Sequence, residues 1–128
     1  AEKVSEIETE KAIHLLQELL PVKIEHFFVY PSEDPTGAPA YEWVFAANTC
    51  VSVEQLSENI DQALMTISAD YREARMDTQV LAKPRVQVIS PHLVKQPVER
   101  KLRGGQFKMK TAFRDKAEFL SFKEHAWE

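Results

Sequence analysis

One apolar stripe constrains the fold of this chain more than any other feature of its sequence. The stripe follows Ser52 with spacings of three, four, four and three residues, and consists of Val53, Leu56, Ile60, Leu64 and Ile67. Ser52 and Gln55 have the spacing of a capping box, so a helix should begin near residue 53. An apolar face of this width is typical of a helix packed against a sheet. We therefore expect a layered domain in which this helix covers strands.

Alternating side chains supply the strands. Residues 22–30, 41–47 and 85–90 alternate between apolar and polar types, and the proline-rich stretch 31–39 between the first two predicts a loop. The first strand should place these residues on one face: Val22, Ile24, His26, Phe28 and Tyr30. We expect His26 to lie at the edge of the core with a hydrogen-bond partner. The first two strands should form an antiparallel hairpin with a long connection.

Two further helices complete the pattern. Ser5 and Glu8 form a capping box before a helix at 6–20, which Pro21 ends, and a last helix is expected around 114–122. The order helix, strand, strand, helix, strand, helix predicts an α+β fold with a small, mostly antiparallel sheet packed against helices. A length of 128 residues fits a single domain spanning 1–128.

The charge is distributed unevenly along the chain. The net charge of −4 combines −10 over residues 1–71, +8 over 72–116 and −2 over the remainder. A basic half on an acidic protein indicates a surface that meets an anion, such as a phosphate, a carboxylate or an acidic partner. A well-solvated surface without a ligand explains the same charges equally well.

Most chemical motifs are absent from the sequence. The four histidines lack metal-ligand spacing and Cys50 is the single cysteine, so we expect no metal site and no internal disulfide. There is no phosphate-binding loop and no dinucleotide fingerprint, so we expect no bound cofactor in this domain alone. Without a leader or a long apolar run, the default is a cytoplasmic soluble protein with no membrane contact.

A basic loop is the remaining candidate. Gly104 and Gly105 allow backbone conformations and close approaches that side chains forbid, and Lys108 follows them. A lysine near such a turn can present a compact positive charge to a phosphate or carboxylate. A solvated surface hairpin remains the alternative. Arg103 before the two glycines is similar to RNA-binding sequences, but the third strand lacks stacking aromatic residues, so we expect no nucleic-acid partner.

The sequence around this loop resembles a known family. Tyr71-x-x-x-Arg75-x-Asp77, a proline-containing turn into strand Arg85–Ile89, and Gly104-Gly105-Gln106-Phe107-Lys108 follow in the order and spacing of the C-terminal domain of auxin-responsive acyl-acid amido synthetases, the Gretchen-Hagen-three family. Upstream, Glu2-Lys3-Val4 resembles the hinge that opens this domain, and Glu42-Trp43 the second strand. The resemblance spans nearly the whole chain, and we expect a bacterial member.

The resemblance implies a function in two parts. In this branch of the firefly-luciferase-like adenylating superfamily, an N-terminal adenylating domain binds ATP, magnesium and a carboxylic acid, and the C-terminal domain closes over them as a mobile lid. The acyl-adenylate then reacts with an amino acid. By resemblance, Lys108 is the catalytic lysine and Gly104, Gly105, Gln106 and Phe107 form the nucleotide-facing or adenylate-facing loop. Glu2 and Lys3 would flank the hinge. We expect the isolated chain to be inactive.

The sequence also leaves other functions open. It departs from the family pattern at Met109-Lys110-Thr111 and at Pro91-His92-Leu93, so another adenylation chemistry or a decayed activity remains an alternative to amide synthesis. A second alternative is a free-standing binding module whose basic Gly-Gly/Lys loop docks an acidic partner or an anionic ligand. The length of the natural polypeptide would distinguish a lid from such a module.

Overall fold

The fold is seen in a computed structural model that describes residues 5–94 and 111–126. It begins with helix α1 (Glu6–Leu19). The Ser5 hydroxyl accepts a hydrogen bond from the Glu8 amide at 3.1 Å, and the Glu8 carboxylate accepts one from the Ser5 amide at 3.1 Å. The reciprocal pair satisfies amides that have no partner within the helix. The predicted capping box is confirmed, and the helix has nearly the predicted bounds.

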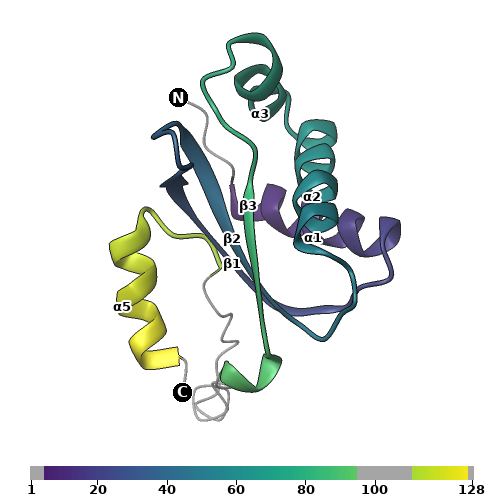
Figure 1. The fold of residues 1–128 in the computed structure, drawn as a ribbon, viewed down its shortest axis with the longest axis vertical. Coiled ribbons are helices and arrows are strands. Elements are labelled where there is room, and N and C mark those ends of the chain that lie inside the picture. Colours follow the sequence, from purple (N-terminus) through teal and green to yellow (C-terminus); the bar gives the residue numbers. More distant parts are fainter. Residues whose placement is uncertain (1–4, 95–110, 127–128) are drawn as a thin grey trace.

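A three-stranded sheet follows in the order β1 (Ile24–Glu33), β2 (Pro39–Ala47) and β3 (Arg85–Ile89) (Figure 1). The first two strands are antiparallel, whereas β3 runs parallel to β2. The sheet is therefore mixed, with its longest pairing antiparallel, and the predicted α+β class is confirmed. The hairpin strands extend further than predicted, so Pro31–Glu33 and Pro39 belong to strands and not to the loop.

A β-bulge between Ile24 and His26 changes which side chains share a face of β1. Ile24 packs in the core with α1 and α2, whereas Phe28 and Tyr30 pack on the opposite face. An extra residue in one strand shifts the alternation by one position. The prediction that Val22, Ile24, His26, Phe28 and Tyr30 share one face was therefore wrong.

The sheet is covered on both faces. Helix α2 (Val53–Ile67) and α1 pack on one face, where Trp43, Phe45 and Leu56 are fully buried. Helix α5 (Lys116–Ala126) lies on the other face, as Figure 1 shows, with Phe119 directed at β1. Short elements complete the described chain: α3 (Ala69–Arg72), the π-helix η1 (Glu73–Asp77) and the 3₁₀-helix η2 (Pro91–Leu93). The result is a three-layer arrangement of helices, sheet and helix.

Candidate functional site

The residues that the sequence singled out for a site lie outside the described residues. They are Glu2, Lys3, Gly104, Gly105, Gln106, Phe107 and Lys108. Their roles stay predictions. The structure does describe the two points at which the polypeptide enters and leaves residues 95–110, together with the surfaces around them.

Both flanks of residues 95–110 are attached to the same buried cluster. Val94, directly before this segment, is 5% exposed, and Phe113, shortly after it, is 6% exposed. The Val29 amide donates to the Thr111 carbonyl at 2.8 Å, and the Phe113 amide donates to the Val29 carbonyl at 2.9 Å. Ala112 thus forms a parallel bridge with the outer edge of β1. The described residues on either side of this segment, Val94 and Phe113, therefore pack on the same face of the sheet.

Aromatic rings fix the second of these flanks. Phe119 of α5 stacks on Tyr30 with ring centroids 4.7 Å apart, and its ring lies 5.4 Å from Phe113 in an edge-on arrangement. Phe28 lies 5.8 Å from Phe119. Stacked and edge-to-face pairs stabilise a core beyond the burial of their area. The flank at Phe113 is therefore held by packing as well as by the backbone bridge.

A polar row lies beside this aromatic cluster on the same face of the sheet. Arg85 Nε lies 3.2 Å from Glu42 Oε1, and Gln87 Nε2 donates to Glu42 Oε2 at 3.4 Å. The Glu42 side chain is only 13% exposed. Burial raises the pKa of the neighbouring Tyr30 hydroxyl, the Glu42 charge raises it further, and Arg85 opposes this rise. The charge of Arg85 is thus already compensated by a carboxylate.

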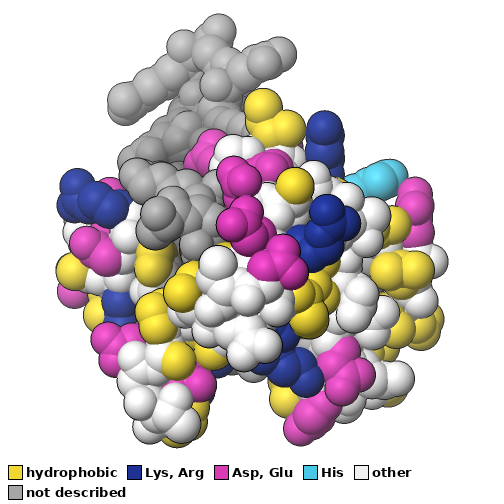
Figure 2. Space-filling view, turned by 90° about the horizontal axis from the view of Figure 1, so that it is seen from above, with side chains coloured by type: hydrophobic (Ala, Val, Ile, Leu, Met, Phe, Trp, Pro, Cys, Tyr) yellow, Lys and Arg dark blue, Asp and Glu magenta, His cyan; other side chains and the backbone are white. Residues whose placement is uncertain are grey.

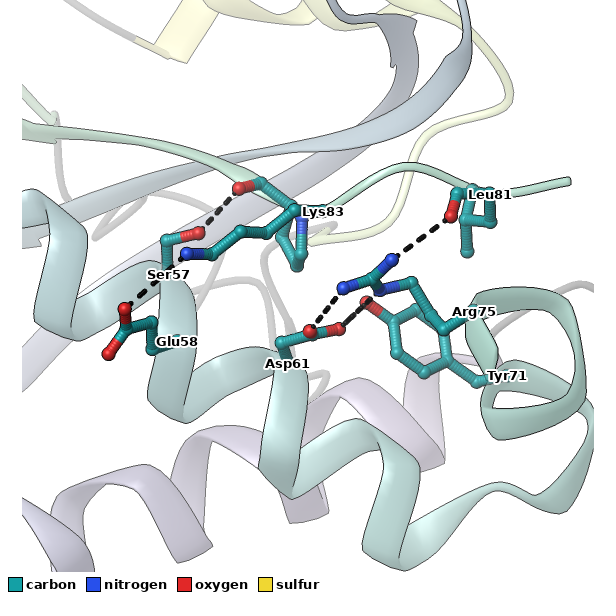
Figure 3. Close-up of polar contacts among 8 residues, drawn as sticks. Ser57, Glu58, Asp61, Tyr71, Arg75, Leu81 and Lys83 are labelled. Atoms are coloured by element: carbon teal, nitrogen blue, oxygen red, sulfur yellow. Dashed lines mark hydrogen bonds and ion pairs between the residues drawn. The ribbon is translucent and has the colours of Figure 1, made fainter. Parts of the chain in front are cut away.

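A second polar cluster connects three segments of the chain (Figure 3). Arg75 donates from Nε to Asp61 Oδ1 at 2.9 Å and from Nη2 to Asp61 Oδ2 at 2.7 Å. Tyr71 donates its hydroxyl hydrogen to Asp61 Oδ1 at 2.7 Å, and Arg75 Nη1 donates to the Leu81 carbonyl at 3.2 Å. Burial and the Asp61 carboxylate raise the pKa of Tyr71 far above its usual range. We refer to Asp61, Tyr71 and Arg75 as the buried triad.

Tyr71 and Arg75, which belong to the Tyr71-x-x-x-Arg75-x-Asp77 pattern, have a structural role in the buried triad. Tyr71 is fully buried and the side chain of Arg75 is 15% exposed, so neither presents a free functional group to a ligand. The sequence analysis missed Asp61, their common acceptor. The sequence offered only a weak signal, because Ser57 and Asp61 are polar residues four positions apart that directly follow the stripe residues Leu56 and Ile60.

A shallow surface hollow of about 360 Å³ lies next to the triad. It is lined by Glu58, Asn59, Asp61, Gln62, Arg75 and Lys83. Lys83 Nζ lies 3.6 Å from Glu58 Oε1, and the Ser57 hydroxyl donates to the Pro84 carbonyl at 2.6 Å (Figure 3). Acidic and basic groups balance in this hollow, which gives it no preference for an anion.

Ion pairs compensate much of the positive charge in the described part of the basic half, residues 72–116. Of the +8 on residues 72–116, +5 belongs to 95–110. In the described part of that half, Arg75, Lys83, Arg85 and Arg114 each form an ion pair with a carboxylate. Figure 2 shows acidic, basic and apolar side chains interspersed on the face it presents. The excess positive charge therefore resides mainly in the segment that contains Lys108.

Neither metal chemistry nor a membrane span finds support in the part of the chain that the structure describes. No group of three or more His, Cys, Asp or Glu side chains there is placed to hold a metal ion. None of the helices within that part combines the length and apolar character that crossing a bilayer requires.

Comparisons with known proteins show which family and which solved structures the chain is similar to. The GH3 family C-terminal domain matches residues 7–117. No curated protein gave a significant sequence match. Among solved structures, AtGH3.15 acyl acid amido synthetase in complex with 2,4-DB is similar with a TM-score of 0.69 and 16% identity, over 99% of this chain and 24% of that chain. A second structure, GH3.15 acyl acid amido synthetase, is similar with a TM-score of 0.58 and 15% identity, over 93% of this chain and 23% of that one.

These findings agree with the resemblance seen in the sequence. At such low identity the solved structures establish a shared fold, and this chain spans about a quarter of the length of each. The expected bacterial origin stays a prediction. The match over residues 7–117 covers most of the chain, from α1 to the start of α5. The chain therefore belongs to the GH3 family, in which it corresponds to the C-terminal domain.

Proposed function

We propose that this chain is the mobile C-terminal lid of an acyl-adenylate-forming amido synthetase, which uses ATP to join a carboxylic acid to the amine of an amino acid. The observation that carries the proposal is the family match over residues 7–117, which includes the loop with Lys108. The two similar solved structures are described as acyl acid amido synthetases. We place the enzyme in the cytoplasm, with the N-terminal adenylating domain of the same polypeptide as the partner of this lid.

Lys108 is the residue to which we assign the chemistry of this chain. In adenylate formation a carboxylate oxygen of the acid would bond to the α-phosphorus of ATP while the bond between the α- and β-phosphates breaks, so negative charge develops on the leaving pyrophosphate. A lysine ammonium brought close to that charge, where water is excluded, stabilises the transition state without reorganising during the step. Gly104 and Gly105 let the loop backbone approach the nucleotide, and Gln106 and Phe107 complete the adenylate-facing loop.

The attachment of this loop supports the role of a lid. Its flanks at Val94 and Phe113 are buried in the aromatic cluster, and the sheet behind them is covered on both faces. A close-packed body of this kind moves as a rigid unit. Rotation at a hinge that includes Glu2 and Lys3 would therefore carry Lys108 toward the nucleotide and away from it.

ATP and magnesium belong to the N-terminal domain in this proposal. The described residues of this chain offer no group of side chains that could hold a metal ion, so they do not fit a magnesium site. Bound there, magnesium would neutralise phosphate charge. This chain contributes the lysine and the closing surface, and we expect no activity from the chain alone.

Two experiments test the proposal. The chain of residues 1–128, mixed with ATP, magnesium and panels of carboxylic acids and amino acids, should release no pyrophosphate above background. In the complete polypeptide, Lys108→Ala should slow ATP–pyrophosphate exchange by about 10²–10³-fold, the usual loss for one electrostatic group. Lys110→Ala removes the same charge two residues away and serves as the matched control.

The outcomes separate this proposal from its alternatives. Turnover by the isolated chain would overturn the lid assignment, and equal exchange rates for Lys108→Ala and the unsubstituted enzyme would remove Lys108 from the mechanism. A natural polypeptide no longer than this chain would favour the free-standing binding module. If exchange occurs with an acid but no amide forms with any amino acid, the enzyme carries out a different adenylation chemistry.

A further inference from the structure

The hollow of about 360 Å³ beside the buried triad is lined by polar side chains, of which four are charged, two of each sign. Helix α2 and the residues that follow it supply this lining: Glu58, Asn59, Asp61, Gln62, Arg75 and Lys83. Its volume lies within the range of about 300–1,000 Å³ that is usual for ligand pockets. The lining therefore favours a small polar ligand over an apolar one.

The charged groups of the hollow differ in how firmly they are held. Asp61 and Arg75 are joined by hydrogen bonds of 2.9 and 2.7 Å, and their side chains are 7% and 15% exposed. Glu58 and Lys83 form a looser pair, with 3.6 Å between Oε1 and Nζ and side chains that are 65% and 49% exposed. Such an exposed pair contributes little to stability, so a ligand can separate it at small cost. As Figure 3 shows, the base is fixed by Asp61 and Arg75, and Glu58 and Lys83 lie further along α2.

Two side-chain amides belong to the same lining. Asn59 donates from Nδ2 to the Gln55 carbonyl at 2.9 Å, which directs one end of its amide to the helix and leaves Oδ1 as an acceptor. The amide nitrogen of Gln62 carries two N–H donors. The hollow therefore combines a cation with an amide donor, and a carboxylate with an amide acceptor.

We propose that this hollow binds a free α-amino acid with a small or polar side chain. Such a molecule carries a carboxylate and an ammonium group on one carbon at neutral pH. Lys83 Nζ and Gln62 Nε2 donate to the carboxylate. The ammonium group donates to the Glu58 carboxylate and to Asn59 Oδ1. A simple anion or a simple cation meets a group of its own sign in this hollow, so the arrangement selects the zwitterion against both.

The amino-acid site is separate from the described flanks of the segment that carries Lys108. Lys83 precedes β3, whereas η2 and Val94 follow that strand, and Figure 1 shows these connections at opposite ends of β3. The contacts of the site come from described residues alone. The inference thus goes beyond the proposed function and does not depend on the role of Lys108.

Binding is measured on the isotope-labelled chain of residues 1–128 by amide chemical shifts. The probe is serine, and its two half-blocked analogues serve as ligand controls: N-acetylserine lacks the ammonium group, and serinamide lacks the carboxylate. Serine should give saturable shifts in α2 and around Lys83, with half-saturation at about 1–10 mM, the affinity of a small ligand with few contacts. Each analogue should bind at least about tenfold more weakly, because it leaves one charged group of the hollow without its partner.

Matched variants assign the shifts to the hollow. Glu58→Gln and Lys83→Gln each remove one charge and should raise the half-saturation concentration for serine about tenfold, the loss of one hydrogen bond to a charged group. Glu18→Gln is the control for the carboxylate, because Glu18 is 61% exposed in α1, and Lys23→Gln is the control for the lysine. Surface substitutions of this type usually leave the fold intact, and thermal melting checks that they do.

Three results would each overturn the proposal. The first is a set of shifts that does not saturate with serine. The second is an equal response to N-acetylserine or to serinamide, which would show that one charge suffices. The third is an unchanged half-saturation concentration in Glu58→Gln or in Lys83→Gln, which would place serine elsewhere on the surface. None of these measurements uses ATP, so they leave the test of the lid separate.

Discussion

Removing the Asp61 carboxylate should cost this domain a large share of its stability. Asp61 is 5% exposed, and its two oxygens accept three hydrogen bonds, two from Arg75 and one from the Tyr71 hydroxyl. Asp61→Ala leaves a guanidinium that is only 15% exposed without its counter-charge and a fully buried hydroxyl without its acceptor. Both groups lose partners that water cannot fully replace.

The size of the effect follows from these burials. Breaking a buried ion pair by removing one partner costs about 3–5 kcal/mol, and an unsatisfied buried hydroxyl alone costs about 1–3 kcal/mol. The two losses share one acceptor and are not additive. Arg75 keeps its hydrogen bond to the Leu81 carbonyl, which places the expected loss near the lower end, at about 3 kcal/mol. Domains are stable by about 5–15 kcal/mol, so the variant should stay folded but be weakened.

Urea unfolding measures this loss, with the fluorescence of the fully buried Trp43 as one probe. The free energy of unfolding should fall by about 3 kcal/mol for Asp61→Ala. Glu58→Ala, which removes the exposed pair with Lys83, should cost no more than about 0.5 kcal/mol. A loss below about 1 kcal/mol for Asp61→Ala would refute the reasoning, because the triad would then contribute no more than a surface ion pair.

Three further predictions concern other parts of the fold. Phe119→Ala should lower the free energy of unfolding by about 3–5 kcal/mol, because the ring is 3% exposed, whereas Leu120→Ala, at 44% exposed, should have little effect; urea titrations compare them. Ser5→Ala removes the cap of α1 and should cost about 1 kcal/mol in the same assay. Burial lowers the pKa of His26 from 6.5, with Glu25 opposing, so the unfolded chain binds the proton more readily and stability falls as the pH drops below 6.5. His26→Gln should reduce that pH dependence in unfolding titrations at pH 5 and 7.5, and an unchanged slope would contradict the assignment.

Elements with strong local signals were predictable from the sequence. The helix at Glu6–Leu19 has its capping box within the first turn, and the helix at Val53–Ile67 has its stripe and its serine cap. The start and the buried face of such a helix depend on hydrogen bonds within one turn and on the spacing of its own apolar residues. Both can be recognised in the local sequence. The final helix, Lys116–Ala126, has a weaker pattern and lies further along than 114–122.

Features that depend on distant residues were not predictable in the same way. At the bulge between Ile24 and His26, the pairing of β1 with β2 shifts by one residue. The alternation of apolar and polar residues within β1 alone does not reveal such a shift. The burial of the second sheet face depends on Phe113 and Phe119, far along the chain from β1. Asp61 has its partners in two later elements, Tyr71 in α3 and Arg75 in η1. The roles of Lys108 and its neighbours came from resemblance and remain predictions.

The parallel pairing of β2 with β3 has a topological cause that also bears on function. Parallel neighbours need a long crossover, and α2, α3 and η1 between these strands supply it. The crossover brings the chain back to the end of the sheet where β3 begins, so the connection of residues 78–84 between η1 and β3 lies there. From that end, β3 carries the chain toward Val94 and the segment with Lys108. The length of β3 thus separates the end of the crossover from Val94, the last described residue before the segment with Lys108.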